Sequence, residues 1–198
     1  MSIRTGLASL LTLVALATSA AAQGRIEVLN SRGEIAPLPG TTILSETLDE
    51  VAFRRAGSDR TETRPGNRVV RIVYGKGSDS LEQARAAVEA GDLRNAVTLY
   101  TTASGETDPP WMAAHALLEL AEVHARQGKQ GLADARAAAQ RFLDQYPDHR
   151  LLPDALLALA TYAAGLGDGT AADDSVRAVL DLVRDDRITS DWGVRAHL

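Results

Sequence analysis

The sequence predicts a mainly α-helical protein with a small β part at its start, and three patterns support this fold class. From residue 77 onward, apolar residues recur every three or four positions, which is the period of amphipathic helices. Gly91, Gly128 and Gly167 each separate two such helices, at intervals of 37 and 39 residues, as in an α-solenoid. Before residue 77, apolar residues alternate with polar ones between turn residues, which is typical of short strands.

The composition excludes several functional classes. The 198-residue chain has a formal net charge of −5 and no cysteine, which rules out disulfide scaffolds, thiolate catalysis and cysteine-ligated metal sites. The chain also lacks the Gly-x-Ser-x-Gly, Gly-x-Gly-x-x-Gly and P-loop signatures of common enzymes. We therefore expect a protein that is not an enzyme and that needs no cofactor or metal ion.

Residues 1–22 are predicted to be a secretory signal peptide. Arg4 gives the start a positive charge, an apolar run follows over 7–17, and small residues precede the expected cleavage site after Ala22. The run is shorter than the roughly 20 residues of a membrane-spanning helix, so we expect no stable membrane insertion after cleavage. The mature protein would begin at Gln23 and reside in the periplasm or cell envelope, stabilised without disulfides.

Residues 23–76 are predicted to form a small β domain, either a barrel or a curled sheet. Its turn signals are Gly33 and the segments 37–40 and 64–67, which contain proline and glycine. The glycine-rich segment 75–78 is predicted to link this domain to the helices. Four short strands are expected, over 26–28, 41–45, 51–53 and 70–74.

Residues 77–198 are predicted to form successive helix pairs. Pro110 and Pro153 suit the first turn of a helix, where the missing N–H needs no partner, and Pro147 stops a helix. The expected helices cover 81–90, 93–103, 110–127, 132–146, 153–166 and 171–184, and a further one could begin within 186–198.

The order of small and aromatic residues in these pairs resembles the tetratricopeptide repeat family. The first pair carries the resemblance most fully, with Ala84, Gly91-Asp92-Leu93, Ala96, Tyr100, Ala103 and Asp108-Pro109. It extends over residues 77–186, although the spacing exceeds the family's period of about 34 residues and the Trp-Leu-Gly opening is absent. The residues that define the repeats are then Gly91, Ala96, Tyr100, Gly128, Ala133, Gly167 and Ala172.

The same resemblance implies a binding function. In this family the first helix of each pair lines a concave surface that takes a peptide or a partner helix, and a mixed apolar and charged groove suits a peptide. An exported β segment ahead of such pairs, with patterns such as Ile26-x-Val28 and Val51-x-Phe53, is also similar to bacterial envelope proteins, which implies a scaffold. The residues expected to face the groove are Leu81, Arg85, Val88, Leu118, Glu122, Arg126, Leu157 and Thr161.

Two other functions stay open from the sequence. The chain could be an accessory or targeting subunit of an envelope enzyme. It could instead be a structural unit that self-associates through the apolar end of its helical array, at residues 192–198, because a solenoid needs polar caps.

Charge divides unequally along the chain. Residues 24–76 contain nine Lys and Arg residues and seven Asp and Glu residues, a net charge of +2. Residues 77–198 contain eleven Lys and Arg residues and nineteen Asp and Glu residues, a net charge of −8. The arginines of the β part could meet an anionic surface, although the interleaved Asp59 and Glu62 favour a solvated loop, and no motif indicates nucleic-acid binding. These arginines are Arg54, Arg55, Arg60, Arg64, Arg68 and Arg71.

Histidine and aspartate spacing gives no metal signature. The four histidines do not form a helical ligand pair, and we expect His115, seven residues before Glu122, to lie on a solvated helix face. Asp168 precedes Asp173 and Asp174 but lacks the alternating ligands of a calcium loop, so we expect a turn followed by helix-start acids.

Overall fold

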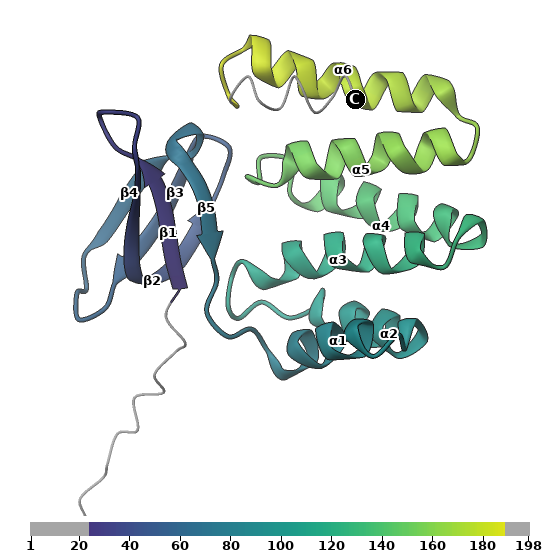
Figure 1. Cartoon of the computed structure of the whole chain (residues 1–198), viewed down its shortest axis with the longest axis horizontal. Helices are drawn as coiled ribbons and strands as arrows, with labels where there is room; N and C mark the ends of the chain where they lie inside the picture. The colour runs from purple at the N-terminus through teal and green to yellow at the C-terminus, as the bar shows by residue number, and fades with distance from the viewer. Residues whose placement is uncertain (1–23, 189–198) are drawn as a thin grey trace, which may run out of the picture.

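The structure, a computed structural model, describes residues 24–188 and places an antiparallel sheet beside a stack of helices (Figure 1). The predicted signal peptide and the apolar end at 192–198 lie outside the described residues. The five strands are β1 (Gly24–Leu29), β2 (Ile35–Glu46), β3 (Glu50–Arg55), β4 (Thr61–Pro65) and β5 (Val69–Val73).

The sheet is open, so the barrel, one of the two predicted forms, is wrong. Among the described residues, the order β4-β3-β2-β1-β5 leaves β4 and β5 with one neighbour each. The long strand β2 changes partner along its length, because residues 35–41 pair with β1 and residues 41–46 pair with β3. Gly40 lies at this change with a φ of 66°, a conformation that glycine adopts without steric cost.

The segment 37–40 lies inside β2, although its prolines predict a turn. Pro37 pairs with Glu27 and Pro39 with Arg25 on β1, in the half of β2 that has no second partner strand within residues 24–188. Proline cannot donate to a sheet ladder and is therefore tolerated where one side of a strand is free. The turn prediction fails here because the free side depends on the sheet topology.

Strand β4 is missing from the predicted set. Residues 61–65 read Thr-Glu-Thr-Arg-Pro, so they show no alternation of apolar and polar residues. The strand pairs with β3 at the edge of the sheet, where polar side chains are usual. The turn predicted at 64–67 is the end of β4 followed by the 3-10 helix η1 (Gly66–Arg68).

Six helices follow as three hairpins that stack in chain order, α1–α2, α3–α4 and α5–α6 (Figure 1). All six predicted helices are confirmed, with small differences at their ends, and none of those described is long and apolar enough to cross a membrane. Their bounds are α1 (Asp79–Glu89), α2 (Leu93–Ala103), α3 (Met112–Arg126), α4 (Leu132–Gln145), α5 (Leu152–Gly165) and α6 (Gly169–Arg184).

Each hairpin turns at one of the three predicted glycines. The φ angles of Gly91, Gly128 and Gly167 are 78°, 79° and 82°, in the left-handed region that favours glycine after a helix. The positive φ that the three positions share explains why glycine recurs between the paired helices.

The alanines that follow these glycines differ in burial, although the sequence predicts equivalent positions for them. Ala96 is fully buried, whereas Ala133 is exposed and Ala172 is half-buried. The second hairpin differs because a 3-10 helix, η2 (Lys129–Gly131), precedes α4 and shifts its register. The buried position is taken by Ala135 instead.

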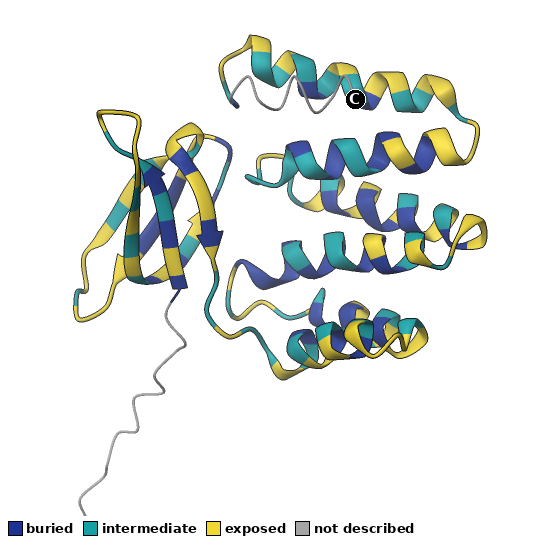
Figure 2. Ribbon diagram, in the orientation of Figure 1, coloured by how far each residue is buried: buried dark blue, intermediate teal, exposed yellow. Residues whose placement is uncertain are grey.

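The sheet docks on the helix ends through the segment after β2. Leu48 is 3% exposed and packs with Leu156, Val179 and Ile188 of the helical part. Its backbone N–H donates to the carbonyl of Asp148, between α4 and α5, over 2.8 Å. Figure 2 shows buried residues in both parts of the molecule, and one apolar cluster contains residues of the sheet and of the helices.

Gly66→Ala should destabilise the protein, because a Cβ at this position would collide with the backbone carbonyl of Leu48. To relieve this collision, η1 must move away from the segment that docks the sheet. We expect the free energy of unfolding in urea to fall by about 1–3 kcal/mol, as for other overpacked sites.

Gly169→Ala is the matched control for this variant. A Cβ at Gly169, in the first turn of α6, meets no atom within 4 Å, and alanine favours helices over glycine. Its stability should be unchanged or slightly higher, and equal destabilisation of both variants would contradict the steric argument.

Candidate functional site

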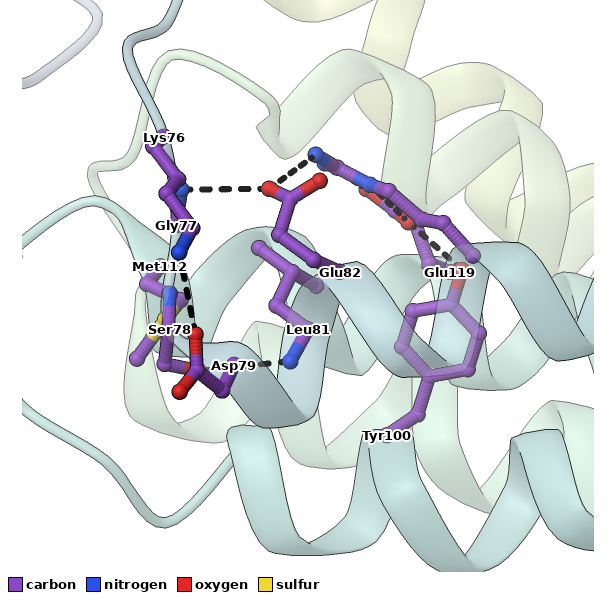
Figure 3. Close-up of polar contacts among 10 residues, drawn as sticks. Lys76, Gly77, Ser78, Asp79, Leu81, Glu82, Tyr100, Met112 and Glu119 are labelled. Carbon is purple, nitrogen blue, oxygen red and sulfur yellow. Dashed lines mark hydrogen bonds and ion pairs between the residues drawn. The ribbon is translucent and has the colours of Figure 1, made fainter. Parts of the chain in front are cut away.

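A carboxylate on α3 joins three helices of the first two hairpins. Glu119 pairs with the guanidinium of Arg85 on α1, with 2.6 Å between Nη2 and Oε1 and 3.0 Å between Nε and Oε2. The hydroxyl of Tyr100 on α2 donates to Glu119 Oε2 over 2.8 Å (Figure 3). Because a two-point arginine–carboxylate pair fixes the orientation of both groups, this network sets how α1 and α3 lie together.

Two members of the network have raised pKa values. The hydrogen bond to Glu119 raises the pKa of Arg85, and burial, aided by the charge of Glu119, raises the pKa of Tyr100. Arg85 therefore stays a cation and Tyr100 stays a neutral donor. The charge of Arg85 is satisfied within the protein.

The start of α1 is held by its own capping contacts. The Ser78 side chain accepts from the N–H of Leu81, and the N–H of Gly77 donates to Glu82 Oε1 over 3.1 Å (Figure 3). Lys76 pairs with Asp79 over 3.0 Å. The predicted linker 75–78 is thus tied to the helix that carries Arg85.

The residues predicted to face a groove divide by burial. Leu81 is fully buried in the core, so it offers no surface to a partner. Val88, Leu118 and Leu157 are half-buried, and each packs against one of the apolar clusters of the core. Arg85 is occupied by Glu119.

Glu122, Arg126 and Thr161 are the exposed members of the predicted groove set. Glu122 and Arg126 lie one turn apart on α3, and Thr161 lies on α5. Although Glu122 is exposed, partial desolvation by its neighbours raises the pKa of its carboxyl; the charge of Arg126 opposes this rise and that of Glu119 adds to it. Burial, with help from the charge of Glu122, raises the pKa of Tyr162 on α5.

The predicted arginine patch is divided among several internal partners. Glu62 pairs with Arg55 over 2.9 Å and with Arg64 over 3.4 Å. Arg71 pairs with Glu27 at a different place on the sheet.

The remaining arginines of the patch differ in their contacts, and Arg60 lies with Arg55 and Arg64 around one pocket. Arg68 donates to the carbonyl of Asn30, whereas Arg54 and Arg60 form no ion pair within residues 24–188. A polar pocket of about 500 Å³ lies on the β3–β4 hairpin. It is lined by Arg55, Arg60, Thr61, Glu62, Thr63 and Arg64.

His115 does not lie on a solvated face. Its side chain is 14% exposed and lies at the contact between the sheet and the helices, where its Nε2 is 3.6 Å from Glu46 Oε1. His149 Nε2 approaches the same oxygen to 3.8 Å, and Tyr74 donates to the other oxygen over 2.6 Å. We call Glu46, Tyr74, Trp111, His115 and His149 the junction.

Sequence reasoning missed both Glu119 and the junction. Glu119 follows Arg85 by 34 residues, the tetratricopeptide period, so the repeat spacing could have indicated that pair. No comparable periodicity connects Glu46 to the histidines, because these residues come from different types of element.

Asp168 behaves as a helix-start acid. Its side chain accepts from the N–H of Ala171, and Arg136 lies 2.9 Å from its carboxylate. These two contacts, the backbone bond first, lower the pKa of Asp168. Over the part of the chain that the structure describes, no group of three or more potential ligand side chains is placed to hold a metal ion.

No protein-family model matches this sequence, and no curated protein matches it either.

Glu119→Gln should destabilise the helical array, because a neutral amide cannot accept both guanidinium bonds. We expect the free energy of unfolding in urea to fall by about 1–2 kcal/mol, near the value of hydrogen bonds to charged groups. Glu82→Gln is the control, because Glu82 is more exposed and lies 3.6 Å from Arg85. A loss of similar size in the control would show that the Arg85–Glu119–Tyr100 network has no special role.

Proposed function

We propose that this protein is exported to the periplasm or cell envelope and acts as a non-enzymatic scaffold. Its helices form three tetratricopeptide-like pairs, and a protein or peptide partner binds on the face of their first helices, α1, α3 and α5. The β part is a second module attached to the same scaffold.

The observation that carries this proposal is the contrast between a fixed framework and an exposed face. Arg85, Glu119 and Tyr100 hold α1 to α3 through short, partly buried contacts. Glu122 and Arg126 project from the same helix α3 and are exposed. A rigid face binds a partner with less loss of conformational freedom than a mobile one.

The repeat geometry also supports the proposal. The three hairpins share a glycine turn with nearly the same φ, and each hairpin contacts the next in chain order. Stacked helix pairs of this kind create extended surfaces that suit peptides and partner helices. The exposed groups include a carboxylate, a guanidinium and a hydroxyl, which suit polar contacts along a peptide.

Photo-crosslinking tests the binding face. A photoreactive amino acid at Thr161 should crosslink to a discrete partner in cells, because this residue is exposed on α5, one of the three first helices. The same group at Arg177, an exposed position on α6, is the matched control. Glu122→Arg should reduce the crosslink at position 161 at least several-fold, and equal crosslinking at both positions would overturn the proposed face.

Processing of the chain tests export. Mass spectrometry of the protein recovered from the envelope fraction should show a mature chain that begins at Gln23. An intact Met1 terminus in the cytoplasmic fraction would contradict export.

Light scattering separates binding of another protein from self-association. A purified chain that is monomeric at micromolar concentration would fit a scaffold for other proteins. A defined dimer that Glu122→Arg does not disturb would favour assembly through the C-terminal end instead.

A further inference from the structure

The junction buries a carboxylate between the two parts of the molecule. Glu46, at the end of β2, has a side chain only 2% exposed. Tyr74, after β5, donates to its Oε2, while His115 of α3 and His149 of the α4–α5 connection face its Oε1. Trp111 packs on Tyr74 with 4.4 Å between ring centroids. The sheet thus meets the helices around one charged group.

The position of the proton on His149 follows from its hydrogen bond. The N–H of Leu151 donates to His149 Nδ1 over 3.1 Å, so Nδ1 is an acceptor and the neutral ring carries its proton on Nε2. That Nε2–H group lies on the side of Glu46. Charging the ring would place a proton on Nδ1 as well, opposite the N–H of Leu151, and the two donors would repel.

The surroundings of His149 also disfavour its charged form. The side chain is 9% exposed, and the rings of Phe142, Tyr146 and His115 lie 5.5, 5.9 and 6.1 Å from its own. An isolated charge in such a place loses much of its hydration.

His149 also lies where the backbones of the two parts touch. It forms a bridge with Thr47, and the preceding residue, Asp148, accepts the N–H of Leu48 over 2.8 Å. A change in the ring therefore acts directly on the contact that docks the sheet.

We propose that His149 is a proton-operated latch, whose neutral ring keeps the sheet docked on the helices and whose protonation in mild acid releases it. The titratable and charged groups that face this ring are Glu46 from β2, Tyr74 from the linker, His115 from α3, Tyr146 from the end of α4, and the adjacent Arg150. Arg150 also donates to the carbonyl of Val70 on the sheet, so it contributes a second contact at the same place.

The electrostatics agree with this geometry. Burial, with help from His115 and Arg150 and against the charge of Glu46, lowers the pKa of His149 from 6.5 to about 4. Burial alone would raise the pKa of Glu46, but its contacts with His115, His149 and Tyr74 lower it. Both groups therefore bind protons more weakly when the sheet is docked.

The direction of the pH effect follows from this difference. The undocked ring regains a pKa near 6.5, so between pH 6.5 and pH 4 the undocked state binds more protons than the docked state. Docking is fully favoured above pH 6.5 and weakens as the pH falls toward 4. From pH 7.5 to pH 5 the equilibrium constant for undocking should rise roughly 30-fold.

Hydrogen exchange of the full chain measures undocking directly. The Leu48 amide is protected by its bond to Asp148 across the contact, so its protection factor, corrected for intrinsic exchange, reports opening of the docked state. We expect this factor to fall roughly 30-fold between pH 7.5 and pH 5. The protection factors of amides within β3 and α4 should fall much less. An equal fall for Leu48, β3 and α4 would indicate global unfolding and overturn the latch.

Two histidine variants complete the test. His149→Asn keeps an acceptor for the Leu151 amide but cannot titrate, so the protection of Leu48 should no longer depend on pH. His124→Asn, at the other end of α3, removes a histidine outside the junction and should preserve the wild-type dependence.

Titration of the wild-type histidine rings by NMR keeps the proposal testable if His149→Asn does not fold. One ring should titrate near pH 4, and its neighbours in space should be junction residues. A His149 ring that titrates near 6.5 in the docked protein, or an unchanged pH dependence in His149→Asn, would refute the latch.

Discussion

The architecture depends on how the Glu46 carboxylate is accommodated. A buried carboxylate is strongly unfavourable unless polar or charged groups surround it. Here Tyr74 donates a hydrogen bond to Oε2, while His115 and His149 approach Oε1 to 3.6 and 3.8 Å, beyond hydrogen-bonding distance. These side chains belong to the linker, to α3 and to the α4–α5 connection. The groups around this one carboxylate therefore connect the sheet to the helical part, and the apolar contacts of Leu48 complete the docking.

The helical array is held together by a different principle. Glycines with positive φ close each hairpin, small residues such as Ala96 allow close packing, and ion pairs such as Arg85–Glu119 connect one hairpin to the next. The pair with Glu119 occupies Arg85, which the sequence predicts to face a groove. The face that is left is defined by the exposed side chains of α3 and α5.

The helices were predictable because their signals are local. A repeat of three or four residues, a proline at the start and a glycine at the end act within one helix, and all six helices formed as expected. The sheet was less predictable, because Pro37 and Pro39 are compatible with β2 only in the half that has one neighbour. The polar edge strand β4 gave no periodic signal, and the insertion of η2 moved the buried alanine from Ala133 to Ala135.

The sequence by itself determined the order of the elements, the glycine turns and the division into a β part and a helical part. These features follow from backbone preferences and from periodicity over a few residues. Only the tertiary structure decided that Leu81 is buried, that Arg85 is paired with Glu119, and that Glu46 meets two histidines more than 60 residues away in the chain. Such pairs depend on how whole elements pack, and no local pattern records the distance between them.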